Sequence, residues 1–436
     1  MIMAMIRPET EMKDSGIEWI GIIPSSWTIF PANGVFSEVK EKNMDLKLTN
    51  AFSFKYGEIV DKKQVGDVDN NLKETLSSYT IVRKNTIMIN GLNLNYDFVS
   101  QRVAIVNESG VITSAYLAIQ PDENKINPRF VLYLLKSYDY QQVFHGLGSG
   151  IRKTLKYQDF KKIMIVAPTL SEQQAIADYL DETCSKIDEI IAEAKASIDE
   201  YKELKQSVIF EAVTKGLDKN INVYKTGNSW IPLLPAGVKL SRFGLHHDII
   251  LGKMLCPTPR NEEDTLEPYY CAANVHFDGV TGELKTMWFN SKEKETYVVH
   301  KNDMLIVEGG AGAGGAAIMN EEPPVSTFVQ NSIMIVRSHM KDNRYSCYLV
   351  QALVKNKYVD VVCNKATIPH FTKEKVSCMP YPVFNRNERN EIANYLDERC
   401  KQIDSLISEK ESLINDLEAY KKSLIYEVAT GKRRVV

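Results

Sequence analysis

Residues 171–216 read SEQQAIADYLDETCSKIDEIIAEAKASIDEYKELKQSVIFEAVTKG, and this stretch decides the fold of the 436-residue chain. It predicts one long helix, because no Pro or Gly interrupts it before Gly216, and Ser171 with Gln174 fits a capping box. At about 1.5 Å per residue, a helix over 172–214 would be roughly 65 Å long. Small or apolar side chains and one Tyr follow a heptad pattern at Leu180, Cys184, Ile187, Ile191, Ala194, Ile198, Tyr201 and Val208. A heptad seam of this kind requires a partner helix.

The partner lies in the same chain. Residues 387–432 read NERNEIANYLDERCKQIDSLISEKESLINDLEAYKKSLIYEVATGK, and they align with the first stretch at a shift of 216 residues without a gap. Within this alignment, 17 of the 39 positions from 176 to 214 are identical. The chain is therefore a tandem duplication, and each copy ends in a long helix.

The duplication extends upstream of the helices. The motif Gly-x-x-Trp-Ile with a following Pro occupies 16–24 and recurs at 227–235. Between this motif and the helix, each copy predicts a hairpin, a buried strand with a Gly- or Asn-rich loop, a helix and a last short strand. These predicted elements lie at 52–60, 86–89, 90–95, 128–136 and 163–166 in the first copy, and at 275–280, 304–307, 309–315, 344–354 and 379–383 in the second. The copies share this order far more than they share residues, which indicates a common role for the helices and different roles for the globular parts.

Composition bounds the function. Apolar residues make up 44% and charged residues 25% of the chain, which is typical of a globular protein in water. The formal net charge of −3 argues mildly against a free-standing nucleic-acid binder. Seven Cys without a CxxC pair favour free thiols in a reducing compartment. No apolar run approaches the length of a membrane span, and the apolar start at 1–6 is too short for a signal sequence, so we expect a cytoplasmic protein.

The order of these motifs resembles a known family. A Gly-x-x-Trp-Ile-Gly-x-x-Pro opening, a globular region, the sequence Glu-Gln-Gln-Ala-Ile-Ala at 172–177 and a helix ending in Glu-Ala-Val-Thr occur in order, and a related series follows. This pattern, over roughly 14–434, resembles the specificity subunits of type I restriction-modification systems. One departure is Glu-Arg-Asn at 388–390, where the first copy has Glu-Gln-Gln.

The resemblance implies an α+β fold. It consists of two α/β target-recognition domains joined by two long antiparallel helices, an intramolecular coiled coil with a pseudo-two-fold tandem repeat. The expected segments are a first recognition domain at 14–168, a central helix at 171–216, a second recognition domain at 225–383 and a C-terminal helix at 387–432.

The resemblance also implies a non-catalytic role in a larger complex. Each domain would read one half of a gapped double-stranded DNA site. The helices would set the spacing and dock two methyltransferase subunits, which methylate adenine at N6, while restriction motor-nuclease subunits join for cleavage. No cofactor is expected on this chain, because S-adenosylmethionine, ATP and Mg²⁺ would be bound by the partner subunits.

Candidate DNA-contacting residues are chosen by residue type and position. Basic side chains beside glycines suit phosphate contacts, and Asn, Gln and Arg near loops suit base edges. In the first copy the candidates are Asn93, Asn95, Gln101, Arg102, Ser149, Arg152, Lys153 and Lys156. In the second copy they are Gln330, Asn331, Lys365, His370 and Lys373.

Other functions fit the sequence less well. Residues 310–315 formally satisfy GxGxxG, but the chain then leads into Pro323-Pro324 rather than into the helix that a dinucleotide site needs. We find no complete catalytic constellation. The alternative to DNA recognition is a coiled-coil scaffold that joins two interaction domains for another polymer.

Overall fold

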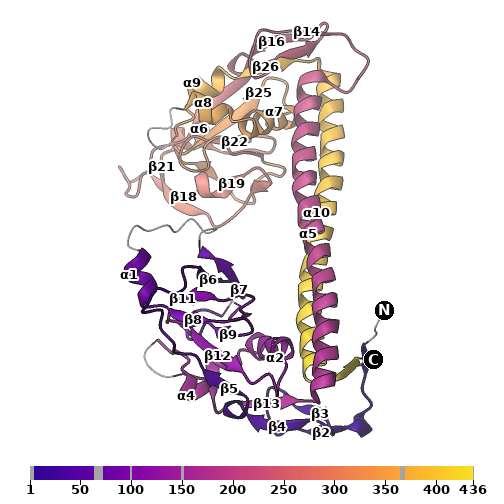
Figure 1. The fold of residues 1–436 in the computed structure, drawn as a ribbon. Coiled ribbons are helices and arrows are strands. Elements are labelled where there is room, and N and C mark those ends of the chain that lie inside the picture. The colour runs from indigo at the N-terminus through magenta and orange to yellow at the C-terminus, as the bar shows by residue number, and fades with distance from the viewer. Residues whose placement is uncertain (1–3, 63–71, 99–100, 149–151, 364–368, 436) are drawn as a thin grey trace. The chain divides into compact units, whose positions relative to one another are not determined.

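The computed structural model describes residues 4–62, 72–98, 101–148, 152–363 and 369–435. The chain divides into two compact units (Figure 1). Unit 1 comprises 1–195 with 411–436, and unit 2 comprises 196–410. Each unit therefore combines one globular region with about half of each long helix, whereas the sequence prediction treats the helices as separate segments.

Both long helices form as the heptad pattern predicts. Helix α5 spans Leu170–Lys215 and helix α10 spans Arg386–Ala429. In unit 1 the Lys421 ammonium pairs with Asp188 at 2.6 Å, and in unit 2 the Lys205 ammonium pairs with Asp404 at 2.7 Å. Because the N-terminal half of each helix meets the C-terminal half of the other, the helices are antiparallel. The two ion pairs are the same pair in the two copies of the repeat.

The helix caps also repeat, but not where the sequence prediction placed them. Ser171 and Gln174 do not form the capping box, because α5 begins one residue earlier than Ser171. The Glu172 amide donates to the Thr169 hydroxyl at 3.4 Å, and in α10 the Glu388 amide donates to the Asn385 side chain at 3.0 Å. The caps therefore lie 216 residues apart, in the register of the repeat.

The globular region of unit 1 contains two four-stranded sheets of order β10-β9-β12-β5 and β7-β6-β11-β8. The strands of these sheets are β5 (Phe36–Glu38), β6 (Ala51–Lys55), β7 (Glu58–Asp61), β8 (Thr80–Val82), β9 (Ile87–Ile89), β10 (Val103–Ile105), β11 (Gly110–Ile112) and β12 (Leu117–Pro121). The other strands of this unit are β1 (Ala4–Ile6), β2 (Met12–Asp14), β3 (Ile22–Pro24), β4 (Thr28–Pro31), β13 (Met164–Ala167) and β27 (Arg433–Val435). Its shorter α-helices are α1 (Leu72–Ser77), α2 (Pro128–Tyr140), α3 (Val143–Gly146) and α4 (Tyr157–Phe160).

Unit 2 contains sheets of order β17-β25-β22-β23 and β21-β18-β24. Their strands are β17 (His247–Leu251), β18 (Thr265–Tyr270), β21 (Lys285–Phe289), β22 (Met304–Val307), β23 (Ala316–Ile318), β24 (Phe328–Val329) and β25 (Ile333–Ser338). The other strands are β14 (Val223–Lys225), β15 (Leu233–Pro235), β16 (Lys239–Arg242), β19 (Val275–His276), β20 (Gly279–Val280) and β26 (Pro380–Val383). Its shorter α-helices are α6 (Ser291–Tyr297), α7 (Arg344–Lys355), α8 (Tyr358–Val362) and α9 (Lys373–Ser377).

The two globular regions share one topology despite their divergent sequences. The order β10-β9-β12-β5 matches β23-β22-β25-β17 strand for strand, and β7-β6-β11 matches β21-β18-β24. In both units the first strand of the hairpin has a parallel neighbour. Strand β6 pairs parallel with β11, and β18 pairs parallel with β24. The counterpart of the predicted hairpin at 52–60 is therefore β18–β21. The hairpin predicted at 275–280 does form, as β19–β20, but it is not the equivalent element that the sequence prediction took it to be.

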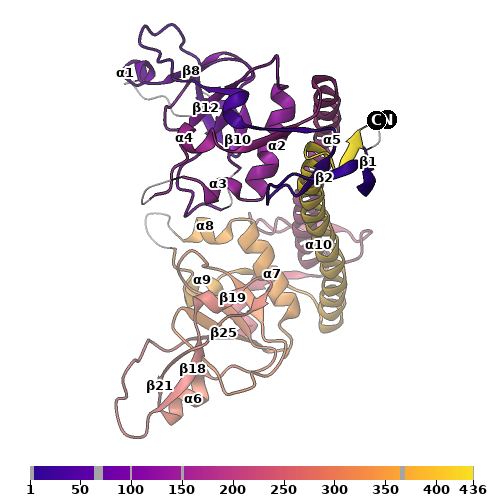
Figure 2. The same cartoon turned by 90° about the horizontal axis from the view of Figure 1, so that it is seen from below.

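The two ends of the described chain lie side by side in unit 1 (Figure 2). Strand β1 pairs antiparallel with β27, and Met5 faces Arg434 in this register. The Lys432 ammonium donates to the carbonyls of Ile20 and Ile22 at 2.6 and 3.1 Å. These contacts fasten the end of α10 to the opening motif of the first copy. No helix among the described residues is long and apolar enough to cross a membrane.

His247 lies in the core of unit 2, where its environment changes its acidity. Its Nδ1–H donates to the Phe243 carbonyl at 2.9 Å, its Nε2 accepts from the Ser346 hydroxyl at 2.8 Å, and the ring stacks on Phe243. Burial lowers the pKa of His247 to about 4. An unfolded histidine titrates near 6.5, so the unfolded chain binds the extra proton first. Burial of His247 therefore lowers the free energy of unfolding of unit 2 as the pH falls from about 6.5 towards 4.

We expect an NMR titration of histidine ring signals to show His247 neutral down to about pH 5, with a midpoint near 4. The signal is assigned by its absence in His247→Gln. A midpoint at or above 6.5 would show that the ring is solvated rather than buried between Phe243 and Ser346.

Candidate nucleic-acid interface

In unit 1, the loop that follows β9 is joined to the basic segment that follows α3. The Leu94 amide donates to the Lys153 carbonyl at 3.0 Å, and the Leu155 amide donates to the Gly91 carbonyl at 2.9 Å. A Cβ on Gly91 would lie 2.7 Å from the Leu155 side chain, so this close approach requires glycine. Two stretches about sixty residues apart in the sequence thus form one surface.

The polar candidates of both stretches gather on this surface. Asn93 is exposed and adopts a left-handed backbone with φ of 52°, while Arg152, Lys153 and Lys156 are exposed beside it. Asn95 is partly buried in the same loop. Ser149 lies outside the described residues. A surface that combines amide side chains with three cations has the composition of a site that contacts phosphates and base edges.

The sequence prediction overlooked aromatic residues in this loop. The side chains of Tyr96 and Phe98 are 70% and 55% exposed. Phe98 stacks on His145 with ring centroids 5.1 Å apart, and His145 Nε2–H donates to the Asp97 carbonyl at 2.9 Å. Exposed aromatic rings next to cations are typical of nucleic-acid surfaces. The run Asn-Tyr-Asp-Phe within an Asn-rich loop is the signal that would have revealed them.

Two candidates of the first copy lie elsewhere. Arg102 is fully buried, so its predicted role in contacting DNA is wrong. Its guanidinium donates to the backbone of the 90–97 loop, and its amide donates to Asp139 at 2.7 Å, a carboxyl group whose pKa is raised by burial to about 6. Gln101 is exposed, but it packs against Gly57 in the β6–β7 hairpin and lines a pocket beside α2.

Unit 2 builds the equivalent surface with different residues. Glu308 follows β22 directly. Its backbone carbonyl accepts a hydrogen bond from the Phe371 amide at 2.6 Å, and its backbone amide donates to the Ser332 carbonyl at 2.9 Å. Three segments therefore meet at Glu308: the glycine-rich loop, the turn at 330–332 and the stretch at 369–373. His370 and Lys373 are exposed there.

The remaining candidates of unit 2 flank this junction. Gln330 and Asn331 are partly buried. The backbone amide of Gln330 donates to the Tyr270 carbonyl at 3.0 Å, and that of Asn331 donates to the Lys253 carbonyl at 2.8 Å. The Gln330 side-chain oxygen accepts from the Ser332 hydroxyl at 3.0 Å, which engages one of its polar groups. Lys365 lies outside the described residues.

The glycine-rich loop itself is a tight connection between antiparallel strands β22 and β23. Gly314 has φ of 87°, and a Cβ there would lie 2.7 Å from Val359. The glycines therefore serve the turn and the packing on α8. Because the loop leads directly into strand β23, it lacks the helix whose N-terminus would bind the pyrophosphate of a dinucleotide.

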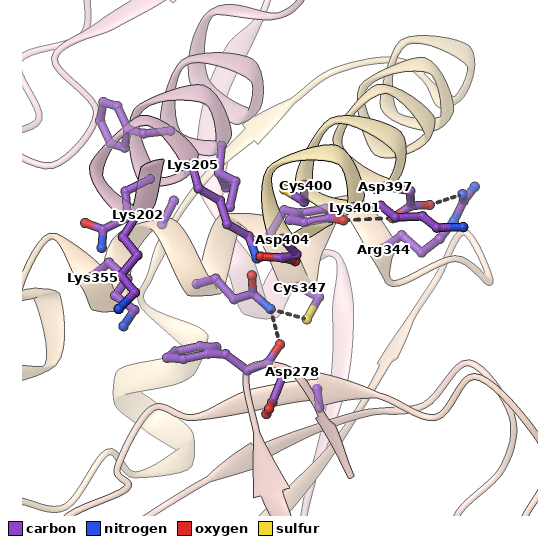
Figure 3. Close-up of a pocket in the computed structure, with 18 of the residues that line it drawn as sticks. Lys202, Lys205, Asp278, Arg344, Cys347, Lys355, Asp397, Cys400, Lys401 and Asp404 are labelled. Carbon is purple, nitrogen blue, oxygen red and sulfur yellow. Dashed lines mark hydrogen bonds and ion pairs between the residues drawn. The ribbon is translucent and has the colours of Figure 1, made fainter. Parts of the chain in front are cut away.

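A second feature occurs in both units, as a groove between the globular helix and the long helices. In unit 2, Arg344 and Tyr348 of α7 donate to Asp397 of α10 at 2.9 and 2.8 Å (Figure 3). In unit 1, Arg129 and Tyr133 of α2 donate to Asp181 of α5 at 2.5 and 2.7 Å. Tyr133, Asp181, Cys184, Asp188, Lys421 and Ile425 line the groove of unit 1, and their repeat equivalents Tyr348, Asp397, Cys400, Asp404, Lys205 and Ile209 line that of unit 2.

The conservation between the copies is thus uneven. Six pairs in the lining of the grooves are identical, although other lining positions differ, such as Ser185 and Lys401. The loop surfaces share their framework and differ in their side chains. Two copies of one scaffold, each with its own exposed loop surface, define a protein class that presents two different recognition surfaces on a common frame.

The comparisons with known proteins specify this class. Residues 24–200 match the family described as "Type I restriction modification DNA specificity domain". A putative type I restriction enzyme MjaX specificity subunit from Methanocaldococcus jannaschii is 23% identical over 95% of this chain and 96% of its own length. The MjaVIII specificity subunit of the same organism is 21% identical over 95% and 94% of the two chains.

Solved structures agree at the level of the fold. A chain from a study of complex assembly and conformational transition of the type I R-M system superposes with a TM-score of 0.70 at 15% identity, covering 94% of this chain and 99% of that one. The HsdS subunit from Thermoanaerobacter tengcongensis gives a TM-score of 0.53 at 14% identity, covering 94% and 98%. Residues 24–200 thus match the type I restriction modification DNA specificity domain, and over nearly its whole length the chain is similar to the specificity subunits of type I restriction-modification systems, a family of non-catalytic subunits.

Proposed function

We propose that each globular region reads one half of a two-part, gapped site in double-stranded DNA, and that the paired helices set the distance between the halves. The observation that carries this proposal is the repeated surface, in which the loop after β9 or β22 is hydrogen-bonded to a polar, partly basic segment. A shared framework with different side chains suits two half-sites of different sequence.

The retained grooves support a common partner for the two units. Since Asp181 with Tyr133 and Asp397 with Tyr348 repeat as a set, we infer that each groove docks one methyltransferase subunit of the same kind. Those subunits would bind S-adenosylmethionine and methylate adenine, and motor-nuclease subunits with ATP and Mg²⁺ would add restriction. The net charge of −3 is compatible with DNA binding when the partners supply part of the phosphate contacts, in a complex assembled in the cytoplasm.

The test is a map of modified bases. The chain is co-expressed with its genomic methyltransferase subunit in bacteria that lack methylation, and the DNA is sequenced by long reads. We expect a two-part motif with N6-methyladenine in each half, and no such motif when this chain is left out. A stable complex with the methyltransferase that methylates no motif would contradict DNA reading, and the absence of any complex would favour a scaffold for another polymer.

A further inference from the structure

Arg102 is a buried charged residue that the interface described above does not use directly. Its side chain has no exposed surface. A buried guanidinium is costly unless hydrogen bonds and an opposite charge compensate it. Its compensation comes almost wholly from the loop that carries Asn93 and Tyr96.

Three backbone carbonyls of the loop accept from the Arg102 guanidinium. Nη1 donates to the carbonyls of Asn90 and Leu92 at 2.8 and 2.9 Å, and Nη2 donates to the carbonyl of Asp97 at 2.5 Å. The Asp97 carboxylate lies 3.6 Å from Nη2 and balances the charge. The planar fork of one arginine thus holds both ends of the loop at once.

The backbone of Arg102 is fixed as well. Its carbonyl accepts from the Asn90 amide at 2.8 Å, and its amide donates to the Asp139 carboxyl group of α2 at 2.7 Å. Two backbone hydrogen bonds to the 153–155 segment hold the loop from the other side. The Leu94 amide donates to the Lys153 carbonyl, and the Leu155 amide donates to the Gly91 carbonyl. Asn93 and Tyr96 therefore project from a loop that is tied to the protein interior.

From this geometry we propose that Arg102 is a positioning residue for the half-site read by the first domain: it sets the conformation in which the 90–98 loop presents its exposed side chains to DNA. This inference rests on the proposed function. In the described part of unit 2, the equivalent loop is held by the Glu308–Phe371 backbone hydrogen bond and by glycines rather than by an arginine, so the proposal concerns the first half-site.

The test compares methylation motifs of complexes that carry Arg102→Met or Arg102→Lys. Methionine fills similar space but removes three hydrogen bonds to loop carbonyls, of which the Asp97 carbonyl keeps its bond from His145. Lysine keeps the charge without the planar fork. We expect one half of the motif to become degenerate, with discrimination at one or more positions reduced about tenfold, while the other half and the gap stay unchanged. Lysine should give the smaller effect.

Two controls separate positioning from stability. Arg83→Met removes an exposed arginine of the same unit, which pairs with Glu41 at 2.7 Å, and should leave the motif unchanged. Ile165→Val weakens the buried strand β13 away from the loop and should lower the number of methylated sites without altering the motif. Fewer methylated sites with an unaltered motif in both Arg102 variants would overturn the proposal, whereas the absence of any two-part motif in the wild type would overturn the proposed function instead.

The proposal remains testable even if the Arg102→Met chain fails to assemble with the methyltransferase subunit. Thermal melting of each purified complex identifies that failure, and the lysine variant then carries the test. An assembled Arg102→Lys complex that reads both half-sites as the wild type does would also contradict the proposal.

Discussion

Leu396→Ala is expected to lower the free energy of unfolding of unit 2 by about 3 kcal/mol. The Leu396 side chain is fully buried, and it belongs to the core that joins α10 to α5 and to the globular region. Removing its branched end leaves a cavity in the buried seam, and this cavity cannot close unless a long helix shifts. Denaturant unfolding, with hydrogen exchange to locate the loss of protection, measures the change.

The repeat offers a matched comparison for this substitution. Leu180 holds the equivalent position in α5 and is also fully buried, so Leu180→Ala should cost a similar amount with the lost protection in unit 1. Leu406 lies on α10 but is 39% exposed, and Leu406→Ala should change stability by well under half as much. Equal losses for Leu396 and Leu406 would contradict the assignment of the buried seam.

Lengthening both helices by one heptad is expected to widen the gap of the DNA site by about three base pairs. Seven residues add about 10 Å to a helix, and base pairs are about 3.4 Å apart. The insertions repeat the preceding heptad after Lys195 and after Lys410, so the buried seam stays in phase in both helices. The modified-base map measures gap and half-sites together.

Four residues inserted after Lys195 alone provide the contrast. They shift the seam of α5 against an unchanged α10, so the ion pairs Lys421–Asp188 and Lys205–Asp404 cannot both form in register. We expect this variant to lose methylation, while the double insertion keeps it. A double insertion that changed the half-site sequences and left the gap as it was would refute the spacing role.

The sequence alone determined the long helices and the tandem repeat. Heptad positions such as Leu180 and Leu396 lie three or four residues from the next apolar position of the pattern, so the period can be recognised without any knowledge of the fold. The order of the elements named in each copy was also predicted, although strands β5, β8, β11, β17, β21 and β24 were missed and the second hairpin was matched to the wrong element.

Only the tertiary structure decided which polar residues face outward. Arg102 and Arg152 are the same residue type in two segments of similar character, yet one is fully buried and the other exposed. The difference arises because the carbonyls of Asn90, Leu92 and Asp97 converge on Arg102, and that convergence depends on how β9, β10 and the 153–155 segment pack. A helix is specified by contacts three and four residues apart, whereas a loop surface is specified by partners tens of residues away, which a single sequence does not pair.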